Sequence, residues 1–142
     1  MGSGIDTDQE RAVGEPQTER GRWLAALVAW TEPLPVIGDR LHELTSYDDD
    51  ADFEEVELPR AALIRHLEAT LAREHSPYEL KRWGYLAFHA DGIIYEGESV
   101  VIPSVLASLA HPGTREILPR ETIEAWIESL KREAADAGSS GV

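Results

Sequence analysis

Prolines divide this chain into segments whose apolar residues repeat at the spacing of an α-helix. Pro59, Pro77 and Pro119 each stand at or just ahead of the start of such a segment, and Pro103 falls in the first turn of another. Proline is favoured in the first helical turn, because its missing N–H would have no intrahelical partner there. A chain punctuated in this way is constrained to short helices that pack against one another. The sequence therefore predicts an all-α fold of five or six helices with one acidic loop.

The ends of these helices carry recognisable signals. Ser76-Pro77-Tyr78-Glu79 has the pattern of a capping box, so a helix is expected to begin at Pro77. Pro33 and Pro35 should end the first helix, and Asp91-Gly92 should end the helix that begins at Pro77. The expected spans are about 17–31, 36–45, 59–74, 77–90, 100–110 and from 119 to beyond 130.

Residues 93–102 allow two interpretations. Ile93-Ile94-Tyr95 and Val100-Val101-Ile102 are β-branched and aromatic runs around Gly97, a composition typical of strands, so a short β-hairpin is one alternative. We favour an irregular loop followed by a helix from about Val100 to Ala110, because the apolar residues of that segment have helical spacing.

The chain is expected to form one domain. Its 142 residues can enclose one core, and 42% hydrophobic content is too high for a disordered acidic chain. The Gly- and Ser-containing ends predict flexible tails at 1–14 and 137–142 around a helical domain at 15–136. Cysteine is absent, so packing rather than disulfides must stabilise the fold.

Acidic residues greatly outnumber basic ones. The chain has 27 Asp+Glu and 13 Lys+Arg, a formal net charge of −14. Such a surface repels nucleic acids and anionic membranes, and it steers cationic proteins toward itself. The first residues lack a secretory signal, and no stretch has the ~18 to 20 apolar residues of a membrane span. We expect a cytoplasmic protein that binds a basic protein, with no direct nucleic-acid or membrane contact, in an oligomeric state that the sequence leaves open.

The densest acidic segment, Tyr47–Glu57, has seven carboxylates in eleven residues and no basic side chain. Its self-repulsion predicts an exposed loop. Three alternating aspartates match the first ligand positions of an EF-hand, but Phe53 stands at the glycine position and Pro59 at the position of the final glutamate. We therefore expect no calcium site here.

Catalytic and metal-binding motifs are missing from the sequence. No two of the five histidines are three or four residues apart, and there is no glycine-rich phosphate loop, nucleophile elbow or cysteine nucleophile. We expect no metal, no cofactor and no enzymatic activity. A small hydrolase that depends on paired carboxylates remains a lesser alternative, because so acidic a chain brings some carboxylates together in almost any fold.

What remains is recognition of a partner, through aromatic contact area and carboxylate steering. The same residues could equally form only a solvated acidic surface. The candidate partner-binding residues are Tyr47, Asp48, Asp49, Asp50, Asp52, Phe53, Glu54, Glu55, Asp91, Tyr95, Glu96 and Glu98.

Four segments between Ser76 and Leu130 resemble a known family. They are Ser76–Trp83, Asp91–Glu96, Val105–Pro112 and Leu118–Glu121, and their order is similar to that in small helical immunity proteins of bacterial polymorphic-toxin and contact-dependent inhibition systems. The resemblance implies a non-catalytic protein that neutralises a cognate toxin by covering its active surface. A nuclease-type toxin needs a positive surface, which the acidic charge would match. The alternative is a regulatory, adaptor or nucleic-acid-mimicking module that binds a basic protein.

Overall fold

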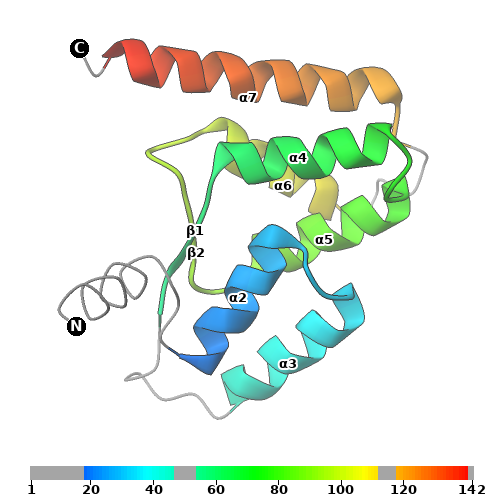
Figure 1. Ribbon diagram of the computed structural model, residues 1–142, viewed down its shortest axis with the longest axis vertical. Helices are drawn as coiled ribbons and strands as arrows, with labels where there is room; N and C mark the ends of the chain where they lie inside the picture. Colours follow the sequence, from blue (N-terminus) through cyan, green and yellow to red (C-terminus); the bar gives the residue numbers. More distant parts are fainter. Residues whose placement is uncertain (1–17, 47–53, 112–117, 141–142) are drawn as a thin grey trace, which may run out of the picture.

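The structure of the protein, a computed structural model, describes residues 18–46, 54–111 and 118–140. Within these residues the chain is mostly helical, as predicted, with a small two-stranded sheet in addition (Figure 1). The elements in chain order are α2 (Glu19–Ala29), α3 (Leu34–Ser46), β1 (Val56–Leu58), α4 (Arg60–Leu71), α5 (Pro77–His89), β2 (Ile93–Tyr95), α6 (Val101–Ala110) and α7 (Arg120–Ser140).

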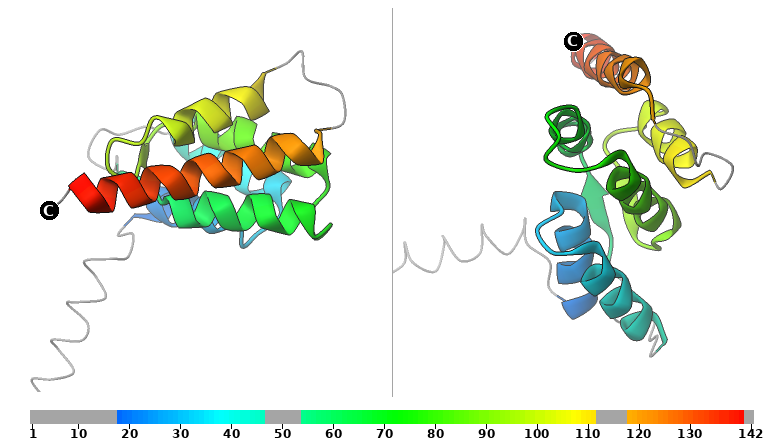
Figure 2. Two further views of the ribbon diagram at one scale, coloured as in Figure 1. Left: turned by 90° about the horizontal axis from the view of Figure 1, so that it is seen from above. Right: turned by 90° about the vertical axis from the view of Figure 1, so that its right-hand side faces the viewer.

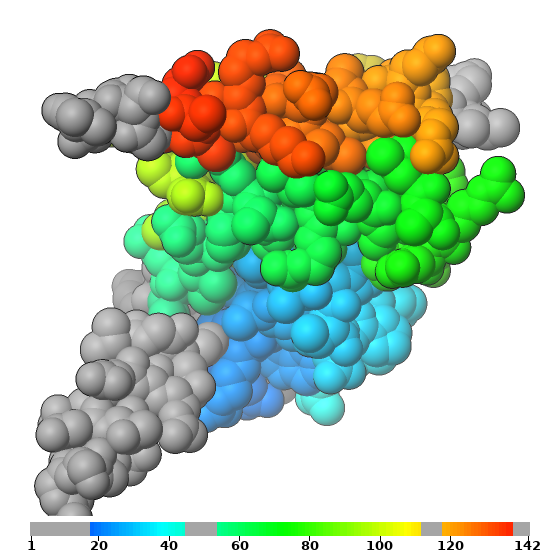
Figure 3. All heavy atoms as spheres, turned by 45° about the horizontal axis from the view of Figure 1, so that its top comes forward, coloured from blue at the N-terminus to red at the C-terminus, as the bar shows by residue number. Residues whose placement is uncertain are grey.

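The helices pack in pairs around α5. Helix α7 lies along α4 and also contacts α6, α6 packs closely on α5, and α2 packs on α3 (Figures 1 and 2). Figure 3 shows α7 as a ridge across the neighbouring α4. Trp83 of α5 is fully buried, in contact with a core to which leucine and isoleucine side chains of every helix contribute. Gly84 permits the close approach of α6, because a Cβ atom there would lie 2.4 Å from that of Leu109.

Local signals set the helix ends much as the sequence predicts. The capping box is present: the Glu79 carboxylate accepts from the Ser76 N–H at 2.8 Å, and the Ser76 hydroxyl accepts from the Glu79 N–H at 3.0 Å. Pro33 and Pro35 were expected to end the first helix, but α2 already ends at Ala29, where Trp30 is a left-handed C-cap with a φ of 57°. Pro35 lies in the first turn of α3. The last helix continues to Ser140, beyond the predicted domain end at residue 136.

The sheet corrects two expectations. Val56 and Glu57 were expected in the acidic loop, but they lie in β1; Ile93–Tyr95 was expected in a loop or a hairpin, but it forms β2. The two strands pair in parallel, with Val56 opposite Ile93 and Leu58 opposite Tyr95. A hairpin pairs sequence neighbours, whereas this pairing needs the crossover through α4 and α5, which no local pattern reveals. The helix after the loop is confirmed as α6.

Candidate functional site

The parallel pairing brings together the two segments that the sequence singles out as contacts. Glu55 directly precedes β1 and Asp91 precedes β2 at the same end of the sheet, while Glu98 follows β2 at the other end. Glu57 lies opposite Ile94, whose apolar side chain is 42% exposed. Glu55, Glu57, Asp91 and Glu98 are also exposed. We call these five residues the acidic sheet surface; it lies on the β1–β2 side of the molecule in Figure 1.

Two of the carboxylates predicted to contact a partner instead form hydrogen bonds within the fold. Glu54 accepts hydrogen bonds from the backbone N–H and the hydroxyl of Thr18, at 2.9 and 2.8 Å, and so ties the start of α2 to the approach to β1. Glu96 accepts from the N–H of Arg60 at 2.7 Å and thereby caps α4. Tyr95 packs against the core from β2, and burial raises the pKa of its hydroxyl. These three side chains are committed to structural contacts.

The remaining candidates divide into two groups. Glu55, Asp91 and Glu98 are exposed, and the carbonyl of Asp91 accepts from the Arg20 guanidinium at 2.5 Å, which anchors the turn before β2 to α2. The others lie outside the described residues: Tyr47, Asp48, Asp49, Asp50, Asp52 and Phe53.

A charge cluster that the sequence analysis missed joins α4, α6 and α7. The Glu133 carboxylate accepts from Arg60 Nε at 2.8 Å, from the Ser99 hydroxyl at 2.5 Å, and from the N–H groups of Val100 and Val101 at 2.9 and 3.2 Å. Burial alone would raise the pKa of Glu133, but these hydrogen bonds outweigh it and hold the pKa at about 2. Glu133 therefore stays ionised and caps α6 from another helix.

Aromatic and histidine rings close the carboxyl end of α2. Trp83 Nε1–H donates to the carbonyl of Leu27 at 2.6 Å, and His66 Nε2 lies 2.7 Å from the carbonyl of Val28. Burial, the largest cause, lowers the pKa of His66 to about 4, so its ring is neutral near pH 7 and Nε2–H donates to that carbonyl. Trp30 stacks on His75 with ring centroids 3.7 Å apart. The helical spacing of Trp83 predicts its burial, whereas nothing local predicts these hydrogen bonds.

A hollow lined partly by arginine lies beyond the carboxyl end of α4, between the turn after that helix and the start of α7. It is formed by segments around residues 70–79 and 118–123. Because its lining comes from two parts of the chain that only the tertiary structure brings together, the sequence analysis did not find it.

Metal chemistry receives no support from the arrangement of side chains. Within residues 18–46, 54–111 and 118–140, no three or more His, Asp or Glu side chains are grouped as a metal ion would require. In the same part of the chain, no helix combines the length and apolarity that crossing a membrane demands.

Comparisons with protein-family models, with curated proteins and with solved structures found no match to this chain.

Proposed function

We propose that this chain is a cytoplasmic, non-catalytic bacterial immunity protein that neutralises a basic, nuclease-type toxin by binding it through the acidic sheet surface. The observation that carries the proposal is the parallel pairing of β1 with β2. It places Glu57 opposite exposed Ile94, with Glu55 and Asp91 ahead of the two strands at one end of the small sheet and Glu98 after β2 at the other end. These four exposed carboxylates are up to 43 positions apart in the sequence.

The chemistry of this surface suits a cationic protein. Ile94 supplies apolar contact area, and the carboxylates around it supply steering toward Lys and Arg side chains. Glu54 joins the chain ahead of β1 to the start of α2, and Glu96 joins the chain after β2 to the start of α4, so the surface is held in place before a partner arrives. A preorganised surface loses less conformational entropy on binding. The formal net charge of −14 adds long-range attraction that weakens with salt.

Affinity capture from a lysate of the source organism, at low and at moderate salt, tests this proposal. The sheet variant carries Glu55→Gln, Glu57→Gln, Asp91→Asn and Glu98→Gln. The control variant carries the same charge change on exposed carboxylates elsewhere, as Glu32→Gln, Asp39→Asn, Glu68→Gln and Glu128→Gln.

The expected result is one basic protein that wild type and control retain in a stoichiometric complex, and that associates with the sheet variant about tenfold more slowly. Expressed alone, that protein should arrest cell growth, and co-expression of this chain should restore it. A captured protein without toxicity would favour the regulatory or adaptor alternative. Equal slowing in both variants would mean that net charge, rather than this surface, drives binding.

A further inference from the structure

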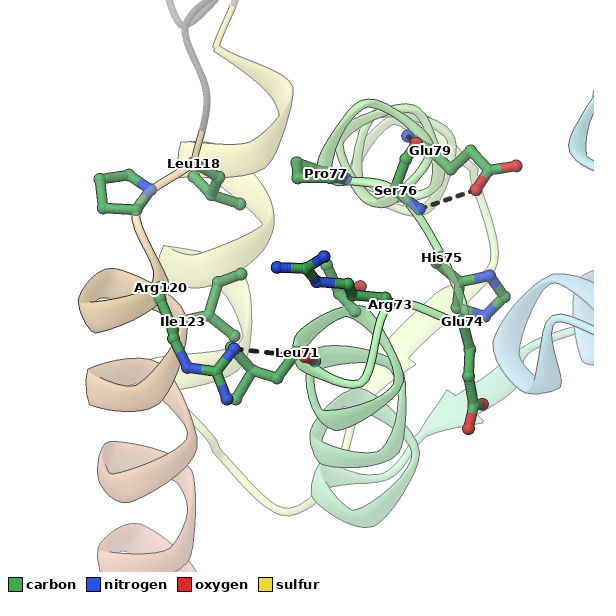
Figure 4. A pocket seen from close by; sticks show the side chains of 12 residues that line it. Leu71, Arg73, Glu74, His75, Ser76, Pro77, Glu79, Leu118, Arg120 and Ile123 are labelled. Atoms are coloured by element: carbon green, nitrogen blue, oxygen red, sulfur yellow. Dashed lines mark hydrogen bonds between the residues drawn. The ribbon is translucent and has the colours of Figure 1, made fainter.

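The hollow beyond the carboxyl end of α4 has the size of a small-molecule site. Its volume is about 670 Å³, within the range of pockets that hold small organic ligands. Leu71, Pro77, Leu118 and Ile123 supply apolar lining (Figure 4). The hollow lies at the opposite end of α4 from β1, so it is separate from the acidic sheet surface (Figure 1).

Two guanidinium groups reach this hollow. Arg73 reaches into it from the turn after α4, and Arg120 reaches across from α7 toward the carbonyl of Leu71 (Figure 4). The carboxylates of Glu74 and Glu79 point away from the space between the two arginine side chains. Glu79 is held in that orientation by the capping box of α5. A partly apolar hollow with two guanidinium groups is thus built into a chain whose formal net charge is −14.

The two guanidinium groups differ in the partners that they already have within the described residues. Arg120 donates to the Leu71 carbonyl at 3.3 Å and pairs with Glu124 at 3.3 Å, so part of its set of donors is already used. The Arg73 guanidinium has no hydrogen bond or ion pair with any residue that the structure describes. A guanidinium has five N–H donors, so Arg73 offers a complete set and Arg120 retains several.

The backbone of Arg73 has a conformation that glycine usually occupies. Its N–H donates to the Thr70 carbonyl at 3.0 Å, and the N–H of Glu74 donates to the Ala69 carbonyl at 2.8 Å. These two bonds form a Schellman motif, in which the position of Arg73 strongly favours glycine. Arg73 occupies it with a φ of 68°. Strained positions of this kind are common at ligand sites.

We propose that this hollow binds an organic oxyanion, a carboxylate or phosphate on an apolar body, with the charged group between Arg73 and Arg120. Guanidinium groups bind both oxyanions through paired N–H donors. The apolar body would pack on Leu118 and Ile123. An amine or an uncharged molecule of the same shape gains no such contact. This inference is independent of the proposed immunity function, because it uses neither the sheet nor a protein partner.

NMR titration of the isotope-labelled full chain tests the proposal with four probes of similar shape. Phenylacetate and phenyl phosphate carry the two candidate anions, benzylamine carries a positive charge, and benzyl alcohol is neutral. The two anions are expected to shift the Nε–H signals of Arg73 and Arg120 and the methyl signals of Leu118 and Ile123. Tighter binding of one anion identifies the head group, and either preference supports the proposal.

Three variants separate recognition from folding. Arg73→Ala should weaken anion binding at least tenfold, as expected for lost hydrogen bonds to a charged group. Arg65→Ala makes the same charge change on an exposed residue of α4 outside the hollow, and should leave the affinity unchanged. Arg73→Gly should also weaken binding tenfold while raising the Tm by about 3 °C, because glycine suits the left-handed backbone.

Three outcomes would overturn the proposal. The first is binding of benzyl alcohol or benzylamine as tight as that of the anions. The second is the absence of shifts at the hollow with both anions at ~10 mM, a concentration that reveals even weak sites. The third is an unchanged affinity in Arg73→Ala.

Discussion

Helix α4 has an arginine at each end, and the fold treats the two in opposite ways. Arg60, its first residue, has a side chain that is only 7% exposed and pairs with Glu133 at 2.8 Å and Glu96 at 3.4 Å. Arg73, just beyond the last turn, is exposed, has a left-handed backbone and pairs with no described residue. The same residue type therefore acts as a structural contact at one end and as an unoccupied donor at the other.

The difference between Arg60 and Arg73 shows that the helix dipole alone does not decide which arginine of α4 is buried. The dipole of α4 disfavours a cation at its amino end and favours one at its carboxyl end, yet the buried arginine is Arg60. Burial is tolerated because two carboxylates from elsewhere in the chain neutralise the guanidinium. A charge that is fully paired holds helices together, whereas one left unpaired on a hollow is available to a ligand.

The largest expected effect comes from removing the buried partner of Arg60. Glu133→Ala should lower the free energy of unfolding by about 3 kcal/mol, because it removes the nearer carboxylate of a buried guanidinium and the acceptor of two helix amides. Urea unfolding measures this change. Glu128→Ala, an exposed position on the same helix, is the matched control and should change stability by less than ~0.5 kcal/mol. Equal effects of the two substitutions would contradict a structural role for the Arg60–Glu133 pair.

Acid should weaken the same end of α4. The pKa of Glu133 is about 2 in the folded chain, against an ordinary value of 4.5. Its contribution is therefore complete above pH 4.5 and is lost as the pH falls through about 2. Urea unfolding at several pH values should show the stability difference between wild type and Glu133→Gln shrinking from pH 5 to pH 2. A constant difference would mean that the ionised form gives no extra stability.

A smaller effect of opposite sign is expected at the carboxyl end of α4. Arg73→Gly should raise the free energy of unfolding by about 1 kcal/mol, because a left-handed backbone costs that much more with a Cβ atom. Arg73→Ala keeps the Cβ and should leave stability nearly unchanged. Thermal unfolding followed by circular dichroism distinguishes the two. If Arg73→Gly destabilises the protein, the side chain of Arg73 contributes to the stability of the fold. Arg73 would then have a structural role, as Arg60 does.

The smallest expected effect concerns the second partner of Arg60. The side chain of Glu96 is 41% exposed, and glutamine could still accept from the N–H of Arg60. Glu96→Gln should therefore change the free energy of unfolding by less than ~0.5 kcal/mol. A loss as large as that of Glu133→Ala, in the same urea assay, would show that the two carboxylates contribute equally to holding Arg60.

The helices could be predicted from sequence because their signals are local. The capping box at Ser76, the prolines in first turns and the apolar stripe that buries Trp83 all act within a few residues. The strands could not be predicted in the same way. Ile93–Tyr95 has a strand-like composition, but its partner, Val56–Leu58, lies beyond two intervening helices. The prediction therefore placed it in a loop or paired it with a neighbour.

The candidate sites also combine features that the local sequence determines with features that only tertiary packing determines. Sequence alone determined the charge of the chain, the absence of cysteine and the acidic character of the segments around β1 and β2, since these are properties of composition and short range. Only the tertiary structure decided which carboxylates remain exposed. Glu54 accepts hydrogen bonds from Thr18, and Glu96 accepts from the N–H of Arg60 and pairs with its guanidinium; both partners are distant in sequence. It also brought Arg73 to the same hollow as Arg120. Contacts between distant residues depend on how the helices pack, which no local pattern specifies.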